Sequence, residues 1–172
     1  MTTANKITLF RVVMIPVFVV LMYLQFPGHQ WAALAVFIIA SLSDMADGYI
    51  ARHYNQVTDF GKFMDPLADK ILVLSAMLLF VEYGRFPAWA IIIVVTREFA
   101  VTGLRLIAVE KGRVIAAAKS GKIKTMLTMI GLCLMLLPVP PVVDLVCMIA
   151  IVVSTLWSGC EYFARNRDML AM

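Results

Sequence analysis

Six long apolar stretches, separated by short polar or turn-forming segments, make up most of this chain of 172 residues. Several approach the roughly 20 residues that a helix needs to cross a lipid bilayer. Of all residues, 62% are hydrophobic and 15% are charged, whereas soluble domains are about 45–50% apolar. We therefore predict an all-α integral membrane protein with six transmembrane helices, folded as a single domain over residues 1–172. The expected spans are residues 11–26, 31–50, 66–83, 87–109, 123–138 and 141–161.

The basic residues indicate how these spans are oriented. Cytoplasmic segments of membrane proteins carry an excess of lysine and arginine. Here that excess occurs at the N-terminus, in segments 51–65 and 105–124, and in the C-terminal tail, whereas Arg85 is the only basic residue in the three opposite connections. We expect a multi-pass protein of the cell membrane with both termini in the cytoplasm. Because this asymmetry accounts for the net charge of +4, no nucleic-acid partner is expected. Residues 1–10 also predict a short interfacial helix ahead of the first span.

Two pairs of aspartates flank the second connection. Asp44 and Asp47 are three residues apart near the end of the second span, and Asp65 and Asp69 are four apart at the start of the third. Either spacing places both side chains of a pair on one face of a helix. Pro66 suits the first position of a helix that starts after Asp65. A helical hairpin would bring both pairs together at the cytoplasmic edge of the membrane.

Such a cluster of carboxylates repels itself, and two divalent cations would neutralise it. Oxygen ligands favour hard cations such as Mg²⁺, Mn²⁺ or Ca²⁺, and two metal ions can hold a pyrophosphate for phosphoryl chemistry. Gly48 and Gly61 would let phosphate approach the backbone, and Arg52 would neutralise phosphate charge. The alternative is a solvated loop whose carboxylates only cap helices.

The segment also carries a complete motif, D-x-x-D-G-x-x-A-R-x8-G-x-x-x-D-x-x-x-D. This pattern, which spans residues 44–69, resembles that of the CDP-alcohol phosphatidyltransferase family, whose members are six-helix membrane proteins that form homodimers. The stretches NKITLFR at 5–11, TREFAVTGLR at 96–105 and AKSGKIKT at 118–125 extend the similarity along the chain. The motif residues are Asp44, Asp47, Gly48, Ala51, Arg52, Gly61, Asp65 and Asp69.

The resemblance implies transfer of a phosphatidyl group from CDP-diacylglycerol to sn-glycerol 3-phosphate, with release of CMP. It implies that two divalent ions, Mg²⁺ or Mn²⁺, are held by the four aspartates, and that Asp69 is also the general base. It further implies a CDP pocket lined by residues of the motif and of the N-terminal segment. These are Asn5, Thr8, Asp47, Gly48, Ala51, Arg52, Gly61 and Asp65.

The acceptor would bring a phosphate, so a second, basic cluster is expected to face the aspartates. Arg97 and Glu98 lie near the middle of the fourth span, where ionisable residues are commonly functional; an internal ion pair is the alternative. Other basic residues of segment 105–124 suit either phosphate binding or contact with lipid headgroups. The candidate phosphate ligands are Arg105, Lys122, Arg113 and Arg97.

Two other hypotheses stay open on the sequence. The first keeps the family and changes the acceptor to inositol phosphate, serine or phosphatidylglycerol, because the aspartates do not distinguish acceptors. The second is a divalent-cation transporter, which would use the carboxylates but leaves Gly48, Ala51, Arg52 and Gly61 without a role.

Overall fold

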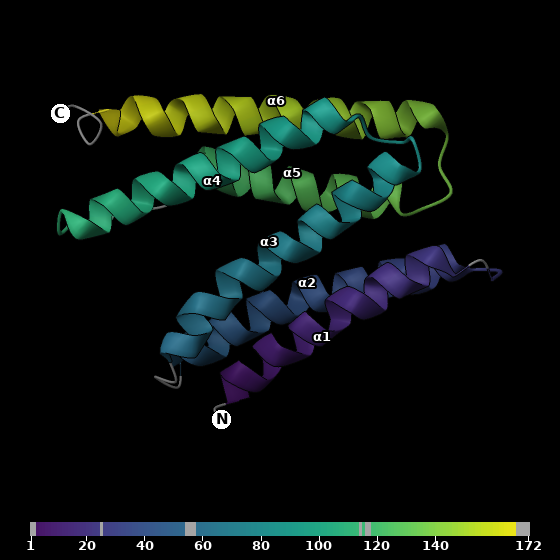
Figure 1. Ribbon diagram of the computed structural model, residues 1–172, viewed down its shortest axis with the longest axis horizontal. Helices are drawn as coiled ribbons and strands as arrows, with labels where there is room; N and C mark the ends of the chain where they lie inside the picture. Colours follow the sequence, from purple (N-terminus) through teal and green to yellow (C-terminus); the bar gives the residue numbers. More distant parts are fainter. Residues whose placement is uncertain (1–2, 25, 54–57, 114, 116–117, 168–172) are drawn as a thin grey trace. The chain divides into compact units, whose positions relative to one another are not determined.

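The computed structural model describes residues 3–24, 26–53, 58–113, 115 and 118–167, and for residues 3–4, 44–53, 59–60 and 62–63 it describes the backbone alone. These residues form six helices and no strand (Figure 1). The predicted all-α class is thus confirmed, and the six helices correspond in number to the six apolar stretches. The helices are α1 (Thr3–Tyr23), α2 (His29–His53), α3 (Asp59–Glu82), α4 (Ala88–Glu110), α5 (Lys119–Met135) and α6 (Pro141–Arg165).

The prediction of a separate interfacial helix over residues 1–10 was wrong. From Thr3 onward, these residues form the first turns of α1, which continues without a break to Tyr23. No glycine or proline interrupts the chain before Pro16, so nothing ends the helix where the polar segment meets the apolar one.

Two further helix starts differ from the predictions. Helix α3 begins at Asp59, so Pro66 lies inside the helix rather than at its first position. A proline there removes one backbone hydrogen bond, yet the helix already starts two turns earlier, where Thr58 accepts a hydrogen bond from the Gly61 N–H. Helix α5 begins at Lys119, so Lys119 and Lys122, which lie before the expected fifth span, are helical.

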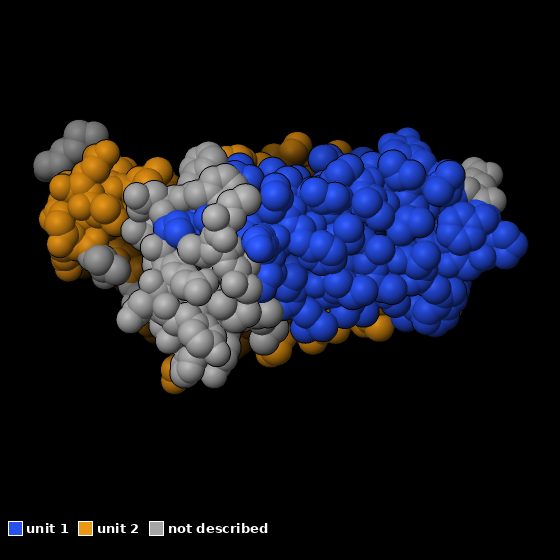
Figure 2. Space-filling model, turned by 90° about the horizontal axis from the view of Figure 1, so that it is seen from below, with its two compact units in different colours: residues 1–82, 136–138 blue, residues 83–135, 139–172 orange. Residues whose placement is uncertain are grey.

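The helices group into two compact units, coloured separately in Figure 2. Unit 1 comprises residues 1–82 and 136–138 and holds α1, α2 and α3. Unit 2 comprises residues 83–135 and 139–172 and holds α4, α5 and α6.

In unit 1, α1 packs against both α2 and α3. The rings of Phe18 and Phe37 lie 5.6 Å apart between α1 and α2, and both are fully buried. Near the C-terminal ends of α1 and α3, the Tyr23 hydroxyl donates to Glu82 at 2.6 Å. Near their N-terminal parts, Thr8 bonds Asp65. Because both contacts advance in the same direction along both helices, α1 and α3 run parallel.

In unit 2, α4 and α5 both pack against α6. A β-carbon at Gly131 of α5 would lie only 3.1 Å from Ile151 Cδ1 of α6, so the glycine permits close packing there. Beside the first turn of α6, the guanidinium of Arg85 binds the buried carboxylate of Asp144 through two hydrogen bonds, at 2.7 and 2.8 Å. This two-bond ion pair holds the segment before α4 to the start of α6.

Two of the described helices are long and apolar enough to span a bilayer, over Asn5–Tyr23 and Pro141–Arg165. The apolar sequence of α4 contains the charged residues Arg97, Glu98 and Arg105, and α5 has three lysines near its start. Large apolar side chains such as Val142 on α6, 68% exposed, cover the outside of the helices. Such surface is typical of contact with lipid, and it supports membrane association.

Candidate active site

The four aspartates lie on the two helices that flank the connection 54–58, as predicted. Asp47 comes six residues before His53 at the end of α2, and Asp65 comes six residues after Asp59 at the start of α3. At about 1.5 Å per residue, both lie about 9 Å from the helix end nearest the connection. Asp44 and Asp69 lie about one turn deeper. The two pairs therefore lie at similar distances along α2 and α3 from the connection between these helices.

Five of the predicted site residues belong to the part of α2 described by its backbone alone. Their side chains lie outside the described residues, so their predicted contacts with metal or nucleotide remain predictions. These residues are Asp44, Asp47, Gly48, Ala51 and Arg52.

On α3, the carboxylate of Asp65 is held by α1. The buried hydroxyl of Thr8 donates to Asp65 Oδ1 at 2.6 Å. Gly61 lies one turn earlier on α3, and a β-carbon on it would lie 3.6 Å from Asp65 Oδ2. Asp69, one turn later, is half-buried. The structure thus brings together three predicted residues, Thr8, Gly61 and Asp65, from two helices.

A residue that the sequence analysis missed, Thr58, completes this group. Its hydroxyl donates to Asn5 Oδ1 at 2.7 Å and accepts from the Gly61 N–H at 3.1 Å. Threonine directly before a helix, bonded to the third helical N–H, is a common N-cap. Such a cap can be anticipated from sequence, whereas its bond to Asn5 depends on how α1 packs.

The polar residues of α1 form one buried stripe at intervals of three. Asn5 and Thr8 contact the α3 side as described, and Arg11 is fully buried and donates through Nε to Ser43 of α2 at 3.2 Å. Ser43 directly precedes Asp44. Buried ionisable groups in membrane helices are commonly functional, and this stripe makes α1 part of the aspartate site.

The described acidic residues of this site, Asp65 and Asp69, suit a hard divalent cation. Asp65 and Asp69 provide carboxylate oxygens on one face of α3, and metal-ligating carboxylates are commonly held by a neighbouring hydrogen bond, as Thr8 holds Asp65. Among the described side chains, no group of three or more acidic, histidine or cysteine residues is gathered as a metal site. Two of the four expected ligands, Asp44 and Asp47, are outside that set.

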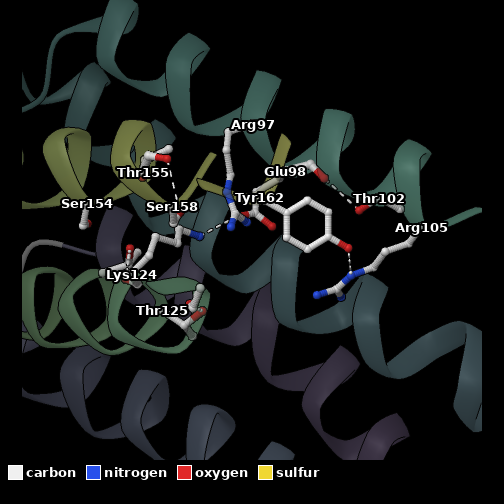
Figure 3. Close-up of polar contacts among 12 residues, drawn as sticks. Arg97, Glu98, Thr102, Arg105, Lys124, Thr125, Ser154, Thr155, Ser158 and Tyr162 are labelled. Atoms are coloured by element: carbon white, nitrogen blue, oxygen red, sulfur yellow. Dashed lines mark hydrogen bonds and ion pairs between the residues drawn. The ribbon is translucent and has the colours of Figure 1, made fainter. Parts of the chain in front are cut away.

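In unit 2, a largely buried charge cluster joins α4 to α5 (Figure 3). Glu98 Oε1 lies 2.5 Å from Lys124 Nζ and 3.1 Å from Arg97 Nη1. The internal ion pair that the sequence left as an alternative for Arg97 and Glu98 is therefore present. One carboxylate faces two cations, so the three side chains together keep a net positive charge.

The Arg97 side chain fits closely between helices. A β-carbon at Gly159 of α6 would lie 3.2 Å from Arg97 Cγ, and one at Gly121 of α5 would lie 3.7 Å from its Nη2. Arg97 Nε is buried and has no hydrogen-bond partner among the described residues. Since an unsatisfied guanidinium N–H is costly to bury, this donor suits an anionic ligand or water.

Further along α4, Arg105 contacts α6. Its Nε donates to the Tyr162 hydroxyl at 3.0 Å, and its guanidinium carbon lies 5.6 Å from the centre of the Tyr162 ring. Figure 3 shows this pair beside the Glu98 cluster. Sequence reasoning missed Tyr162, and it counted Lys124 only among the basic residues of a loop. A polar aromatic residue in an apolar helix was the available signal for Tyr162.

The remaining two predicted phosphate ligands are placed differently. Lys122 lies on α5 with an exposed side chain, and Arg113 lies exposed just beyond α4. There Gly112 adopts a φ of +70°, which ends the helix. Of the four predicted ligands, Arg97 alone is mostly buried and shares a polar cluster with other charged residues.

Comparison with known proteins identifies the family of this chain. The family model described as CDP-alcohol phosphatidyltransferase matches residues 1–157. The chain belongs to the CDP-alcohol phosphatidyltransferase family, and it is therefore an enzyme.

Individual relatives match over 80–95% of their own length. The CDP-diacylglycerol–glycerol-3-phosphate 3-phosphatidyltransferase of Bacillus subtilis (strain 168) is 44% identical, over 96% of this chain and 95% of the relative. A probable phosphatidylglycerophosphate synthase of Mycobacterium tuberculosis (strain H37Rv) is 39% identical, over 94% and 80%. A Shigella flexneri protein with the same description as the first is 37% identical, over 95% and 94%.

Proposed function

We propose that this enzyme transfers the phosphatidyl group of CDP-diacylglycerol to sn-glycerol 3-phosphate, yielding phosphatidylglycerophosphate and CMP. Relatives described as catalysing this transfer share 37–44% identity over at least 95% of this chain. The structural observation that carries the proposal is the Asp65 site. There α1 holds a carboxylate of α3 directly, with Asp69 one turn away and a second aspartate pair at matched depth on α2.

In this proposal the nucleotide binds between α1, α2 and α3. Asn5 and Thr8 would close the CDP pocket from α1, and Gly61 and Asp65 would line it from α3. At Gly61 a β-carbon would lie 3.3–3.6 Å from three oxygen atoms, so the glycine permits the close approach of Asn5 to α3 at this edge of the pocket. From α2 the pocket would take Asp47, Gly48, Ala51 and Arg52.

We infer that Asp44, Asp47, Asp65 and Asp69 hold two divalent ions, Mg²⁺ or Mn²⁺. When bound, such ions neutralise the pyrophosphate charge and stabilise the attacking and leaving oxygens of a phosphoryl displacement. Carboxylate oxygens are the ligands that these cations prefer, and the bond from Thr8 would orient Asp65 for this task.

The chemical step needs a proton acceptor, and Asp69 is assigned that role. Its carboxylate would take the proton of the acceptor hydroxyl, and the hydroxyl oxygen would then attack the β-phosphorus of CDP-diacylglycerol. The new O–P bond forms as the bond from the β-phosphorus to the bridging oxygen breaks, and that oxygen leaves with CMP. General-base catalysis of this kind contributes about 10²–10⁴-fold.

The phosphate of the acceptor would bind the basic residues of unit 2. Arg105 presents a guanidinium that Tyr162 holds through one hydrogen bond and a cation–π contact, which leaves its Nη donors for a phosphate. Arg97 adds a buried positive charge, and Lys122 and Arg113 add exposed ones.

We further propose that all six helices cross the membrane as one catalytic domain, with both termini and the active site on the cytoplasmic side, and that two copies form a homodimer. The diacylglycerol tails support a membrane location, because each methylene withdrawn from apolar surroundings costs about 0.8 kcal/mol. The exposed apolar side chains of the helices are suited to surrounding lipid.

The decisive experiment measures CMP release by the purified protein with CDP-diacylglycerol and a panel of acceptors. Glycerol 3-phosphate is expected to support release far better than inositol phosphate, serine or phosphatidylglycerol. Preference for another acceptor would keep the family chemistry and overturn the proposed acceptor. Absence of CMP release with every acceptor, together with divalent-metal flux into liposomes, would support a transporter instead.

A further inference from the structure

Thr58 connects α1 to the start of α3. Its hydroxyl accepts from the Gly61 N–H at 3.1 Å and donates to Asn5 Oδ1 at 2.7 Å. The first bond caps α3 and is local in sequence. The second joins residues 53 positions apart and therefore fixes the first turns of α1 against α3. One hydroxyl group thus serves both the helix start and the tertiary contact.

Gly61 shows how closely this contact is built. A β-carbon there would lie 3.3 Å from Thr58 Oγ1, 3.5 Å from Asn5 Oδ1 and 3.6 Å from Asp65 Oδ2. Three oxygen atoms from α1, from α3 and from the residue before α3 therefore surround one backbone position. Thr8, one turn after Asn5, then reaches Asp65 Oδ1.

We infer that Thr58 is a positioning residue, whose hydroxyl holds Asn5 and Thr8 of α1 over Asp65 of α3. The inference rests on the proposed function, in which Asn5 and Thr8 close the pocket for CDP. Because Thr58 donates to Asn5 Oδ1, its hydroxyl fixes the orientation of the Asn5 amide. Thr58 itself is not assigned any contact with the nucleotide.

Three substitutions separate the cap from the interhelical bond. Thr58→Val removes both while keeping the side-chain shape. Thr58→Gly removes the donor, yet glycine caps a helix nearly as well as threonine, so α3 should keep its start. Thr58→Ser retains both hydrogen bonds. Thr125→Val is the matched control, because the exposed Thr125 hydroxyl bonds a carbonyl of its own helix, that of Gly121.

Two measurements are made on each purified full-length variant in detergent with Mg²⁺. Steady-state kinetics give the KM for CDP-diacylglycerol and the kcat at saturating glycerol 3-phosphate. Amide hydrogen exchange at residues 5–10 reports the attachment of α1 without depending on activity. For both Thr58→Val and Thr58→Gly we expect KM to rise about ten-fold, as for loss of one part-buried hydrogen bond. We also expect little change in kcat and faster exchange, with Thr58→Ser and Thr125→Val resembling the wild type.

Unchanged exchange at residues 5–10 in both Thr58→Val and Thr58→Gly would overturn the inference. So would faster exchange with an unchanged KM, or a fall in kcat alone. Failure of the proposed function would look different from failure of this inference, because the wild-type protein itself would then release no CMP with glycerol 3-phosphate. In that case the exchange data would still decide whether Thr58 attaches α1.

Discussion

The hydroxyl of Thr8 donates a hydrogen bond of 2.6 Å to Oδ1 of Asp65, and so joins α1 to the helix that carries two of the four motif aspartates. The bond is buried on the Thr8 side. It places the first helix of the chain, remote in sequence from the aspartate motif, within the proposed catalytic site.

Replacing Thr8 with valine is expected to weaken metal binding. Loss of a partner that orients a metal-ligating group typically costs about 10–100-fold in metal affinity or activity. We expect the Mg²⁺ concentration for half-maximal CMP release to rise about ten-fold, whereas Thr8→Ser keeps the donor and the wild-type value. An unchanged Mg²⁺ dependence in Thr8→Val would show that the Thr8–Asp65 hydrogen bond does not contribute to metal binding.

Asp69→Asn is expected to abolish transfer, because an amide cannot take the proton of the acceptor hydroxyl. The fall in kcat should be at least about 100-fold, the lower range for removal of a general base. Binding of CDP-diacylglycerol, measured by calorimetry in detergent, should remain largely intact. Full turnover by this variant would remove Asp69 from the mechanism.

For the cluster around Glu98, we predict that removing the carboxylate lowers stability more than removing one of the two cations. Glu98→Gln leaves Arg97 and Lys124 facing each other without a counter-charge, whereas Lys124→Gln leaves Glu98 paired with Arg97. Removing one partner of a buried pair costs about 3–5 kcal/mol, and we expect that range for Glu98→Gln and less for Lys124→Gln. Thermal unfolding midpoints in detergent test the order.

The matched control for this cluster is Glu161→Gln. Glu161 pairs one turn later on α6 with Arg165, whose side chain is 67% exposed, and a pair with a solvent-exposed partner contributes about 0–1 kcal/mol. Equal losses of stability in Glu98→Gln and Lys124→Gln would contradict the role of Glu98 as shared counter-charge. Adding Lys124→Gln to the Glu98→Gln variant should recover part of the loss.

Arg105→Ala is expected to raise the KM for glycerol 3-phosphate with a smaller effect on the KM for CDP-diacylglycerol. Loss of a charge-assisted hydrogen bond to phosphate costs about 1.5–3 kcal/mol, so the increase should be roughly ten-fold or more. Tyr162→Phe should show a weaker form of the same effect, since the ring is kept and the hydroxyl that accepts from Arg105 is lost. Arg165→Ala, at an exposed site, is the control. An unchanged KM in Arg105→Ala would assign the phosphate to Lys122 or Arg113.

Much of the site was predictable because its signals are local. The apolar stretches predicted six helices, and the spacing of Asp65 and Asp69 predicted one helical face. The bounds were less accurate where a side chain decides them. Pro66 suggested a helix start, but Thr58 caps α3 two turns earlier, and α5 begins four residues before the expected fifth span.

By itself, the sequence determined the helical class, the apolar surface and the position of the aspartates, because helical period and hydrophobicity act between near neighbours in the chain. Only the tertiary structure decided that Thr58 bonds Asn5, that Lys124 pairs with Glu98, and that Tyr162 holds Arg105. Each of these contacts joins residues far apart in sequence, so it depends on which helix faces pack together, and no local pattern specifies that.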